Sequence, residues 1–138
     1  MKVSSMKWEN RFSVGVKVID DQHKKLVALI SEIEYLHKQD SIDVKQAAGV
    51  LQELKKYTLT HFSEEEEVMQ RHGFAGLERH KKLHQEFIDK VELFESKFEK
   101  GPKQVLDIML PFLSKWLRYH ILVEDKRYSK NVDEKFKL

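Results

Sequence analysis

The chain has 138 residues, a length that fits one domain with a single buried core. Charged residues make up 35% of it, whereas five glycines and two prolines are too few for the many turns of a β-sheet protein, so the composition favours long amphipathic helices. The 25 Lys and Arg are interspersed with 23 Asp and Glu, and the resulting net charge of +2 argues against a nucleic-acid-binding surface.

The chain contains no cysteine. Disulfides, zinc–thiolate sites and iron–sulfur clusters are therefore excluded, and any metal ligands must be His, Asp or Glu. The N-terminal residues lack the apolar core of a signal peptide, and no stretch approaches the roughly 18 apolar residues of a membrane span. We expect no membrane insertion and a cytoplasmic location.

The first half of the chain predicts an arm and two helices. Residues 1–16 show no sustained helical period but contain Trp8 and Phe12, which predict an extended arm whose aromatic side chains pack on the domain. From 17 to about 37, apolar residues recur at spacings of three, four and seven, which is typical of one helix face. After a polar break, a second helix is expected to begin near Ile42 and to continue past residue 65.

The second half predicts two more helices. Beyond two glycines, the third helix has a stripe at alternating spacings of three and four, formed by Leu77, His80, His84, Phe87, Val91, Phe94 and Phe98. A Gly-Pro turn precedes the fourth helix, whose expected core face consists of Val105, Ile108, Phe112, Trp116 and His120.

Four helices of roughly 20 residues with short polar links predict an all-α fold, an up-down-up-down antiparallel four-helix bundle. We expect one domain over residues 1–138. It consists of an N-terminal arm (1–16), the bundle with a short C-terminal helical segment (about 17–128) and a tail (129–138).

Histidines occupy positions in these stripes where a purely structural bundle would have Leu or Ile. Five of the seven histidines fall on inward faces: His23, His61, His80, His84 and His120. Glu65 follows the second of them by four residues, and the third and fourth are four apart, so each pair lies on one helix face about 5–6 Å apart. A single inward histidine is more often a hydrogen-bonded core residue, but so many without a shared ion would leave polar groups unpaired at ~1–3 kcal/mol each. The set therefore predicts a metal site.

Two acidic segments need separate interpretation. In the run Glu64 to Glu67, only Glu65 has the four-residue relation to a histidine, so we expect the other three on a solvated face. Asp125 follows His120 by five residues, which on an ideal α-helix turns it about 140° away. The last turn must unwind, bulge or end if Asp125 is to face the site. His37 and His72 are expected to lie outside it.

Taken in order, these segments resemble the signatures of the hemerythrin family, from about Trp8 to Tyr128. The matching segments are Asp21-Gln22-His23, His61-Phe62-Ser63-Glu64-Glu65, His80-Lys81-Lys82-Leu83-His84 and Trp116-Leu117-Arg118-Tyr119-His120-Ile121, with Asp125. The resemblance implies two non-haem irons (Fe²⁺/Fe³⁺) joined by a solvent-derived oxo or hydroxo bridge and by Glu65 and Asp125. It also implies that one iron is bound by His80, His84 and His120, and the other by His23 and His61.

By the same resemblance, dioxygen binds reversibly at the iron with fewer ligands, in an apolar pocket formed by Leu26, Phe62, Trp116, Leu117 and Ile121. Storage, transport or delivery of dioxygen to an oxygen-consuming enzyme is the expected role, without enzymatic activity. A di-iron oxidase or peroxidase is an alternative, but such bundles use more carboxylate ligands. An oxygen or nitric-oxide sensor or an iron-handling protein would use the same residues and require a partner.

Overall fold

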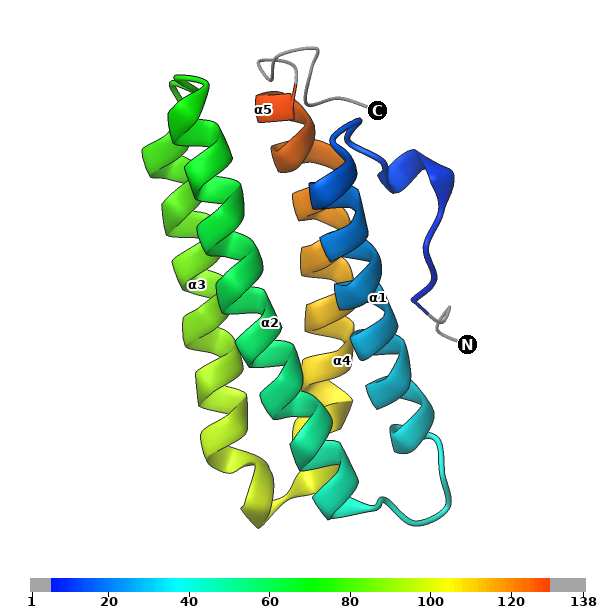
Figure 1. Cartoon of the computed structure of the whole chain (residues 1–138). Helices are drawn as coiled ribbons and strands as arrows, with labels where there is room; N and C mark the ends of the chain where they lie inside the picture. The colour runs from blue at the N-terminus through cyan, green and yellow to red at the C-terminus, as the bar shows by residue number, and fades with distance from the viewer. Residues whose placement is uncertain (1–5, 130–138) are drawn as a thin grey trace.

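The computed structural model describes residues 6–129, and these form the predicted four-helix bundle without a β-strand (Figure 1). The long helices are α1 (Lys17–His37), α2 (Val44–Arg71), α3 (Leu77–Lys97) and α4 (Pro102–Tyr119). Shorter elements are the 3₁₀ turns η1 (Asn10–Phe12) and η2 (Phe98–Lys100), the π-helical η3 (His120–Asp125) and α5 (Lys126–Ser129). The outermost parts of the predicted arm and tail, 1–5 and 130–138, lie outside the described residues.

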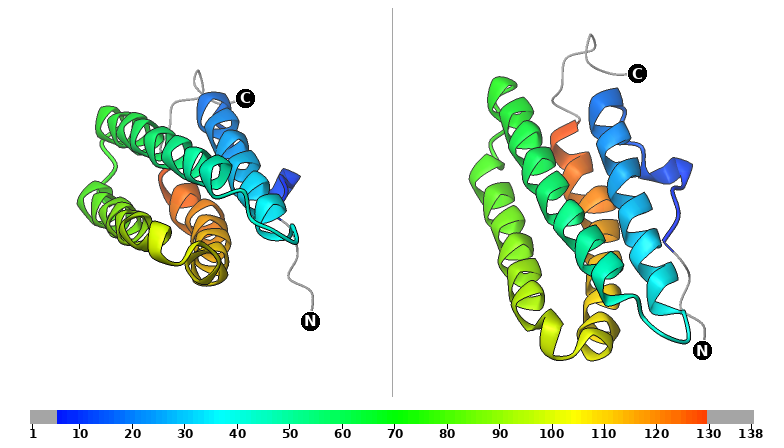
Figure 2. Two further views of the ribbon diagram at one scale, coloured as in Figure 1. Left: turned by 90° about the horizontal axis from the view of Figure 1, so that it is seen from below. Right: turned by 60° about the horizontal axis from the view of Figure 1, so that its bottom comes forward.

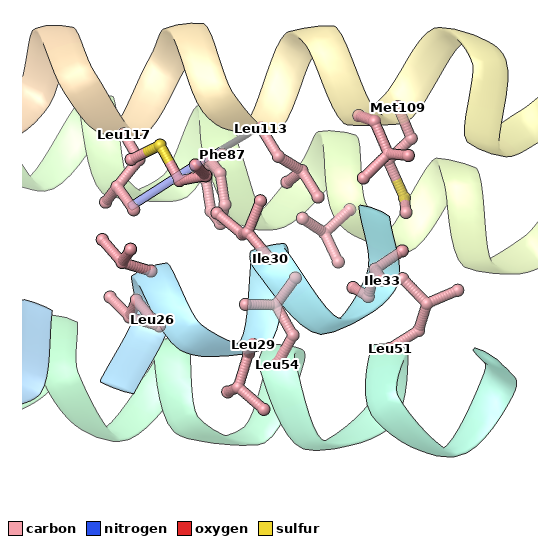
Figure 3. Packing of buried hydrophobic residues seen from close by; sticks show 14 of the residues in the cluster. Leu26, Leu29, Ile30, Ile33, Leu51, Leu54, Phe87, Met109, Leu113 and Leu117 are labelled. Atoms are coloured by element: carbon pink, nitrogen blue, oxygen red, sulfur yellow. The ribbon is translucent and has the colours of Figure 1, made fainter. Parts of the chain in front are cut away.

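The helices surround a common core. Each long helix packs against the next in sequence, and α1 also packs against α4. The four helices therefore form a closed antiparallel bundle (Figure 2). Leucine and isoleucine side chains from α1, α2 and α4 meet in the middle, as Figure 3 shows for Ile30, Leu54 and Leu113. Burial of such side chains is the main stabilising contribution of a bundle. Among the described residues, no helix is both long and apolar enough to cross a membrane.

One predicted core position in α4 is wrong. Ile108 is 65% exposed, whereas Leu106, Met109 and Leu113 are buried. Because α4 is rich in apolar residues on more than one side, its periodicity fits several core faces, and contact with α1 and α3 decides between them.

The N-terminal arm packs on the bundle as predicted. Phe12 is fully buried, and the carboxylate of Asp20 accepts hydrogen bonds from the backbone N–H of Val14 (2.8 Å) and the hydroxyl of Ser13 (2.6 Å). Gly15 has a φ of 78°, a left-handed conformation that glycine adopts without a steric penalty, and there the arm turns into α1.

Both ends of α2 are capped by recognisable local motifs. Its first residue, Val44, follows Asp43, whose carboxylate accepts a backbone N–H of the first turn (3.0 Å). Past the other end, Gly73 has a φ of 65°, and the N–H of Phe74 donates to the carbonyl of Met69 (3.0 Å). This is the Schellman arrangement, which reverses the chain toward α3.

Candidate metal centre

Seven side chains from the four-helix bundle and its C-terminal extension meet in its interior, and each residue is at most 2% exposed. Helix α1 contributes His23, α2 contributes His61 and Glu65, and α3 contributes His80 and His84. The first and last residues of η3, His120 and Asp125, complete the set. The side-chain atoms form two groups that could each hold a metal ion. One group contains Glu65 and three histidines, and the other contains Glu65, Asp125 and two histidines.

The first group contains His80, His84 and His120, here called the histidine trio. The Nε2 atom of His120 lies 3.2 Å from that of His80 and 3.0 Å from that of His84. Metal–nitrogen bonds of about 2.1 Å at right angles place neighbouring nitrogens about 3.0 Å apart. The spacing of the trio therefore suits three adjacent ligand positions on one ion.

The second group contains His23 and His61, here called the histidine pair. The two carboxylates lie between the pair and the trio. Glu65 presents Oε1 to the trio at 2.9–3.4 Å, and Oε2 to His61 at 3.5 Å and His23 at 3.6 Å. Asp125 presents Oδ1 to His80 (3.0 Å) and His120 (2.9 Å), and Oδ2 to His23 (2.9 Å). Each carboxylate thus directs one oxygen to each group.

The donor atoms fit metal ions better than they fit one another. Within residues 6–129, both ring nitrogens of His23, Nε2 of His61 and both oxygens of Asp125 are buried and make no hydrogen bond of good geometry, although Asp125 lies within ion-pair distance of three histidines. Buried polar atoms are rarely left unpaired, because each costs about 1–3 kcal/mol. Imidazole and carboxylate are both suitable ligands for divalent transition metals, so ions in the two groups would remove this cost for the Nε2 atoms of His23 and His61 and for the oxygens of Asp125.

The charges of the centre are strongly coupled. Burial alone would lower the pKa of His23 and His80, but the carboxylates of Asp125 and Glu65 raise the pKa of each to about 9. Burial lowers the pKa of His61 to about 3, and the neighbouring cationic histidines act in the same direction. Burial would raise the pKa of Glu65, but the surrounding imidazoles hold it well below its ordinary value. Without a metal, imidazolium cations therefore balance the two carboxylates.

The distortion predicted for the last turn is a π-helix. α4 ends at Tyr119, and the segment from His120 to Asp125 has the wider i→i+5 repeat. This repeat allows residues five apart to face the same way, so both ends of η3 reach the centre. Glu124 beside Asp125 is buried and binds Arg79 in a bidentate ion pair (2.5 and 3.1 Å). Arg79 immediately precedes His80, so this ion pair joins the neighbours of two centre residues.

Two acidic residues expected on a solvated face also connect to histidines of the centre; Glu64 is exposed as expected, whereas Glu66 is half-buried. The carboxylate of Glu66 accepts a hydrogen bond from Nδ1 of His84 (2.8 Å). Glu64 accepts one from the side-chain amide of Gln22, whose oxygen in turn accepts from Nδ1 of His61 (2.6 Å). Spacing along α2 cannot reveal these contacts, because the histidine or the amide involved lies on another helix. Such partners fix the tautomer and direction of a ligating imidazole.

Apolar and aromatic side chains seal the centre. Phe62 stacks on the ring of His84 (3.7 Å between centroids, 2° between planes), and Trp116 stacks on that of His120 (4.4 Å, 13°). Next to them is a cavity of about 10 Å³, comparable to a single water. Its walls include four predicted pocket residues, Leu26, Phe62, Trp116 and Leu117. The fifth, Ile121, is fully buried but does not line this cavity.

The two remaining histidines lie outside the centre. His37 is at the C-terminal end of α1, where its Nε2 lies 2.7 Å from Oδ1 of Asp107 on α4. His72 is the C-terminal cap of α2. Neither belongs to a group of side chains that could hold a metal among the described residues.

Comparison with known proteins gives a consistent result. Residues 14–131 match the family model described as the hemerythrin HHE cation binding domain. Bacteriohemerythrin from Pseudomonas aeruginosa PAO1 is 37% identical over 122 residues, covering 88% of this chain and 77% of the relative. Bacteriohemerythrin from Clostridium acetobutylicum is 34% identical over 124 residues, covering 88% and 96%. A crystal structure of wild-type hemerythrin superimposes with a TM-score of 0.80 at 26% identity, covering 92% of this chain and 97% of that one.

Proposed function

The chain belongs to the hemerythrin family, as its sequence predicted, and we propose that it binds two iron ions and, through them, dioxygen reversibly. The observation that carries this proposal is the placement of the two carboxylates. Glu65 and Asp125 each direct one oxygen to the histidine trio and the other to the histidine pair. A carboxylate with both oxygens engaged in this way is suited to bridge two ions.

The uneven number of histidines supports an asymmetric centre. If the two carboxylates and a solvent-derived oxygen are shared, the ion on the trio has six ligands and the ion on the pair has five. The vacant position would then belong to the ion held by His23 and His61. Leu26 lies one helical turn after His23, and the ring centroid of Phe62 lies 5.7 Å from that of His61, so we expect apolar side chains to border that position.

Two ferrous ions would supply the two electrons that dioxygen takes up on binding and would recover them on release. The chain's own contribution is to hold the ligands and exclude water. The cavity beside the centre has walls of aliphatic and aromatic side chains apart from Thr58, whose hydroxyl donates to the carbonyl of Leu54 (2.6 Å). Its small volume means that dioxygen enters only when side chains move.

The donor set favours reversible binding over an oxidase or peroxidase reaction. Ferritin-like di-iron bundles use four glutamates and two histidines, whereas this centre offers two carboxylates and five neutral imidazoles. Fewer anionic ligands stabilise ferrous iron and provide less negative charge for oxygen–oxygen cleavage. We therefore propose storage or transport of dioxygen, with an oxygen-consuming enzyme as recipient.

The test is an anaerobic absorption spectrum of the iron-loaded protein, recorded again in air and after degassing. We expect two irons per chain and a charge-transfer band that appears in air and disappears on degassing without a reductant. One zinc per chain, or an irreversible change to the diferric spectrum, would contradict the proposal.

A further inference from the structure

The two groups of histidines differ in what binds their outward ring nitrogens. In the trio, Nδ1 of His84 lies 2.8 Å from a carboxylate oxygen of Glu66. In the pair, Nδ1 of His61 lies 2.6 Å from the amide oxygen of Gln22. Nδ1 of His23 is buried and has no hydrogen-bond partner among residues 6–129. Of the Nδ1 atoms described here, the one that contacts a charged acceptor belongs to the trio. Neither Nδ1 atom of the pair contacts a charged acceptor.

The orientation of the Gln22 amide follows from its second contact. Its Nε2 group donates to the carboxylate of Glu64, which can only accept, so its oxygen must face His61. The imidazole N–H of His61 then donates to that oxygen. A neutral amide thus separates the ring of His61 from the nearest outer carboxylate, whereas the ring of His84 contacts its carboxylate directly.

A carboxylate acceptor on Nδ1 makes an imidazole a stronger electron donor at Nε2. A stronger donor stabilises the ferric ion relative to the ferrous ion, because the ferric ion carries more positive charge. The side chains of His84 and Glu66 are 3% and 25% exposed, so water screens this interaction only in part. A neutral amide has a much weaker effect on His61.

We propose that Glu66 is a positioning residue that makes the iron on the histidine trio the easier of the two to oxidise. This inference rests on the proposed function. When an external one-electron oxidant such as ferricyanide takes one electron from the diferrous protein, the ferric ion forms on the trio. The iron on the pair remains ferrous. The vacant position therefore belongs to a ferrous ion, which attracts water and anions less strongly than a ferric ion would.

Two variants move the charge without changing side-chain size. Glu66→Gln keeps an acceptor for His84 but removes its charge. The double variant Gln22→Glu with Glu64→Gln exchanges the two partners, keeps the net charge and places a carboxylate directly on His61. The control is Glu67→Gln, which removes the same charge from the same helix at a side chain that is 67% exposed and paired with Arg71.

Spectroelectrochemical titration of the iron-loaded proteins gives the midpoint potentials of the two successive one-electron steps. Glu66→Gln should raise the first by about 59 mV, the equivalent of a tenfold change in the ferric-to-ferrous ratio. The double variant Gln22→Glu with Glu64→Gln should lower the midpoint potential of the second step, and Glu67→Gln should change neither potential. In NMR spectra of the diferrous protein, Glu66→Gln should also move the paramagnetically shifted N–H resonance of His84.

Equal potentials in Glu66→Gln and Glu67→Gln, with an unmoved His84 resonance, would overturn the inference. If Glu66→Gln loses its iron, the test is the double variant Gln22→Glu with Glu64→Gln. The inference is then overturned if the midpoint potential of its second step does not fall. A failure of the proposed function is seen separately, as an iron count below two or an irreversible reaction with air in the unmodified protein.

Discussion

Four consecutive glutamates in α2 illustrate how position on a helix assigns different roles to one residue type. Glu65 points into the centre, Glu66 binds the outer nitrogen of His84, Glu64 binds an amide of α1, and Glu67 pairs with Arg71 at the surface. The sequence predicted Glu65, because its partner His61 is four residues away on the same helix. It could not predict the next residue's role, since the spacing between α2 and α3 is a property of the packed bundle.

Replacing Glu65 by alanine should abolish binding of both irons. Its two oxygens face the trio and the pair, so the change removes a ligand from each ion and leaves Asp125 as the remaining carboxylate of the centre. Iron analysis after anaerobic reconstitution should fall from two per chain to less than one, with the helical circular dichroism retained. Glu67→Ala and His37→Ala are the controls and should bind two. Two irons in Glu65→Ala would refute its bridging role.

At the level of elements, the sequence predicted the four helices and a distortion between His120 and Asp125, but not which distortion. The five-residue spacing is incompatible with one face of an α-helix, and this alone required the turn to change. Which change occurs depends on contacts with other elements, and the π-helix is accompanied by one such contact, the ion pair of Glu124 with Arg79 on α3. One position of the predicted core face of α4, Ile108, was misassigned for a similar reason, because contacts with neighbouring helices choose between equally apolar faces.

Arg79→Ala should loosen η3. The change leaves the carboxylate of Glu124 buried without its bidentate partner, so the free energy of unfolding should fall, although solvent screening at the exposed Arg79 side chain (55%) keeps the loss small. Because Asp125 is the next residue, the affinity for ferrous iron should fall about tenfold. Urea unfolding and anaerobic iron titration provide the two measurements.

Lys81→Ala is the matched control for Arg79→Ala. It removes one positive charge from the same helix, at a side chain that is 46% exposed and paired only loosely with Glu78 (3.8 Å). Lys81→Ala should change neither the free energy of unfolding nor the affinity for ferrous iron. Equal losses in both variants would show that the ion pair with Glu124 does not hold η3 in place.

For the whole molecule, the bundle and its charged centre form one thermodynamic unit. The same four helices that bury the apolar core also bury two carboxylates and five imidazoles, so the metal-free protein must balance those charges with protons. The raised pKa values of His23 and His80, about 9, express this balance. Their contribution to stability is fully present below about pH 6.5 and is lost as the pH rises through about 9.

Iron binding should therefore release protons and strengthen with pH. His23 and His80 are protonated at pH 7 in the metal-free protein and must both lose their protons to bind iron. Burial would lower the pKa of His120 too, but Asp125 and Glu65 raise it, so we expect about two protons or more to be released per chain at pH 7, and a steep rise in ferrous-iron affinity from about pH 6 to about pH 9. Anaerobic calorimetry in buffers with different ionisation enthalpies measures both. An affinity independent of pH would contradict the charge balance described.

A crystal structure of the diferric protein with azide tests the central claim most directly, because it shows the number of ions, their shared ligands and the vacant position at once. We expect two irons, with Glu65 and Asp125 each bound to both. Azide should bind only to the iron held by His23 and His61, facing the apolar side chains next to it. A single metal, or azide on the iron of the histidine trio or between the two irons, would contradict this account.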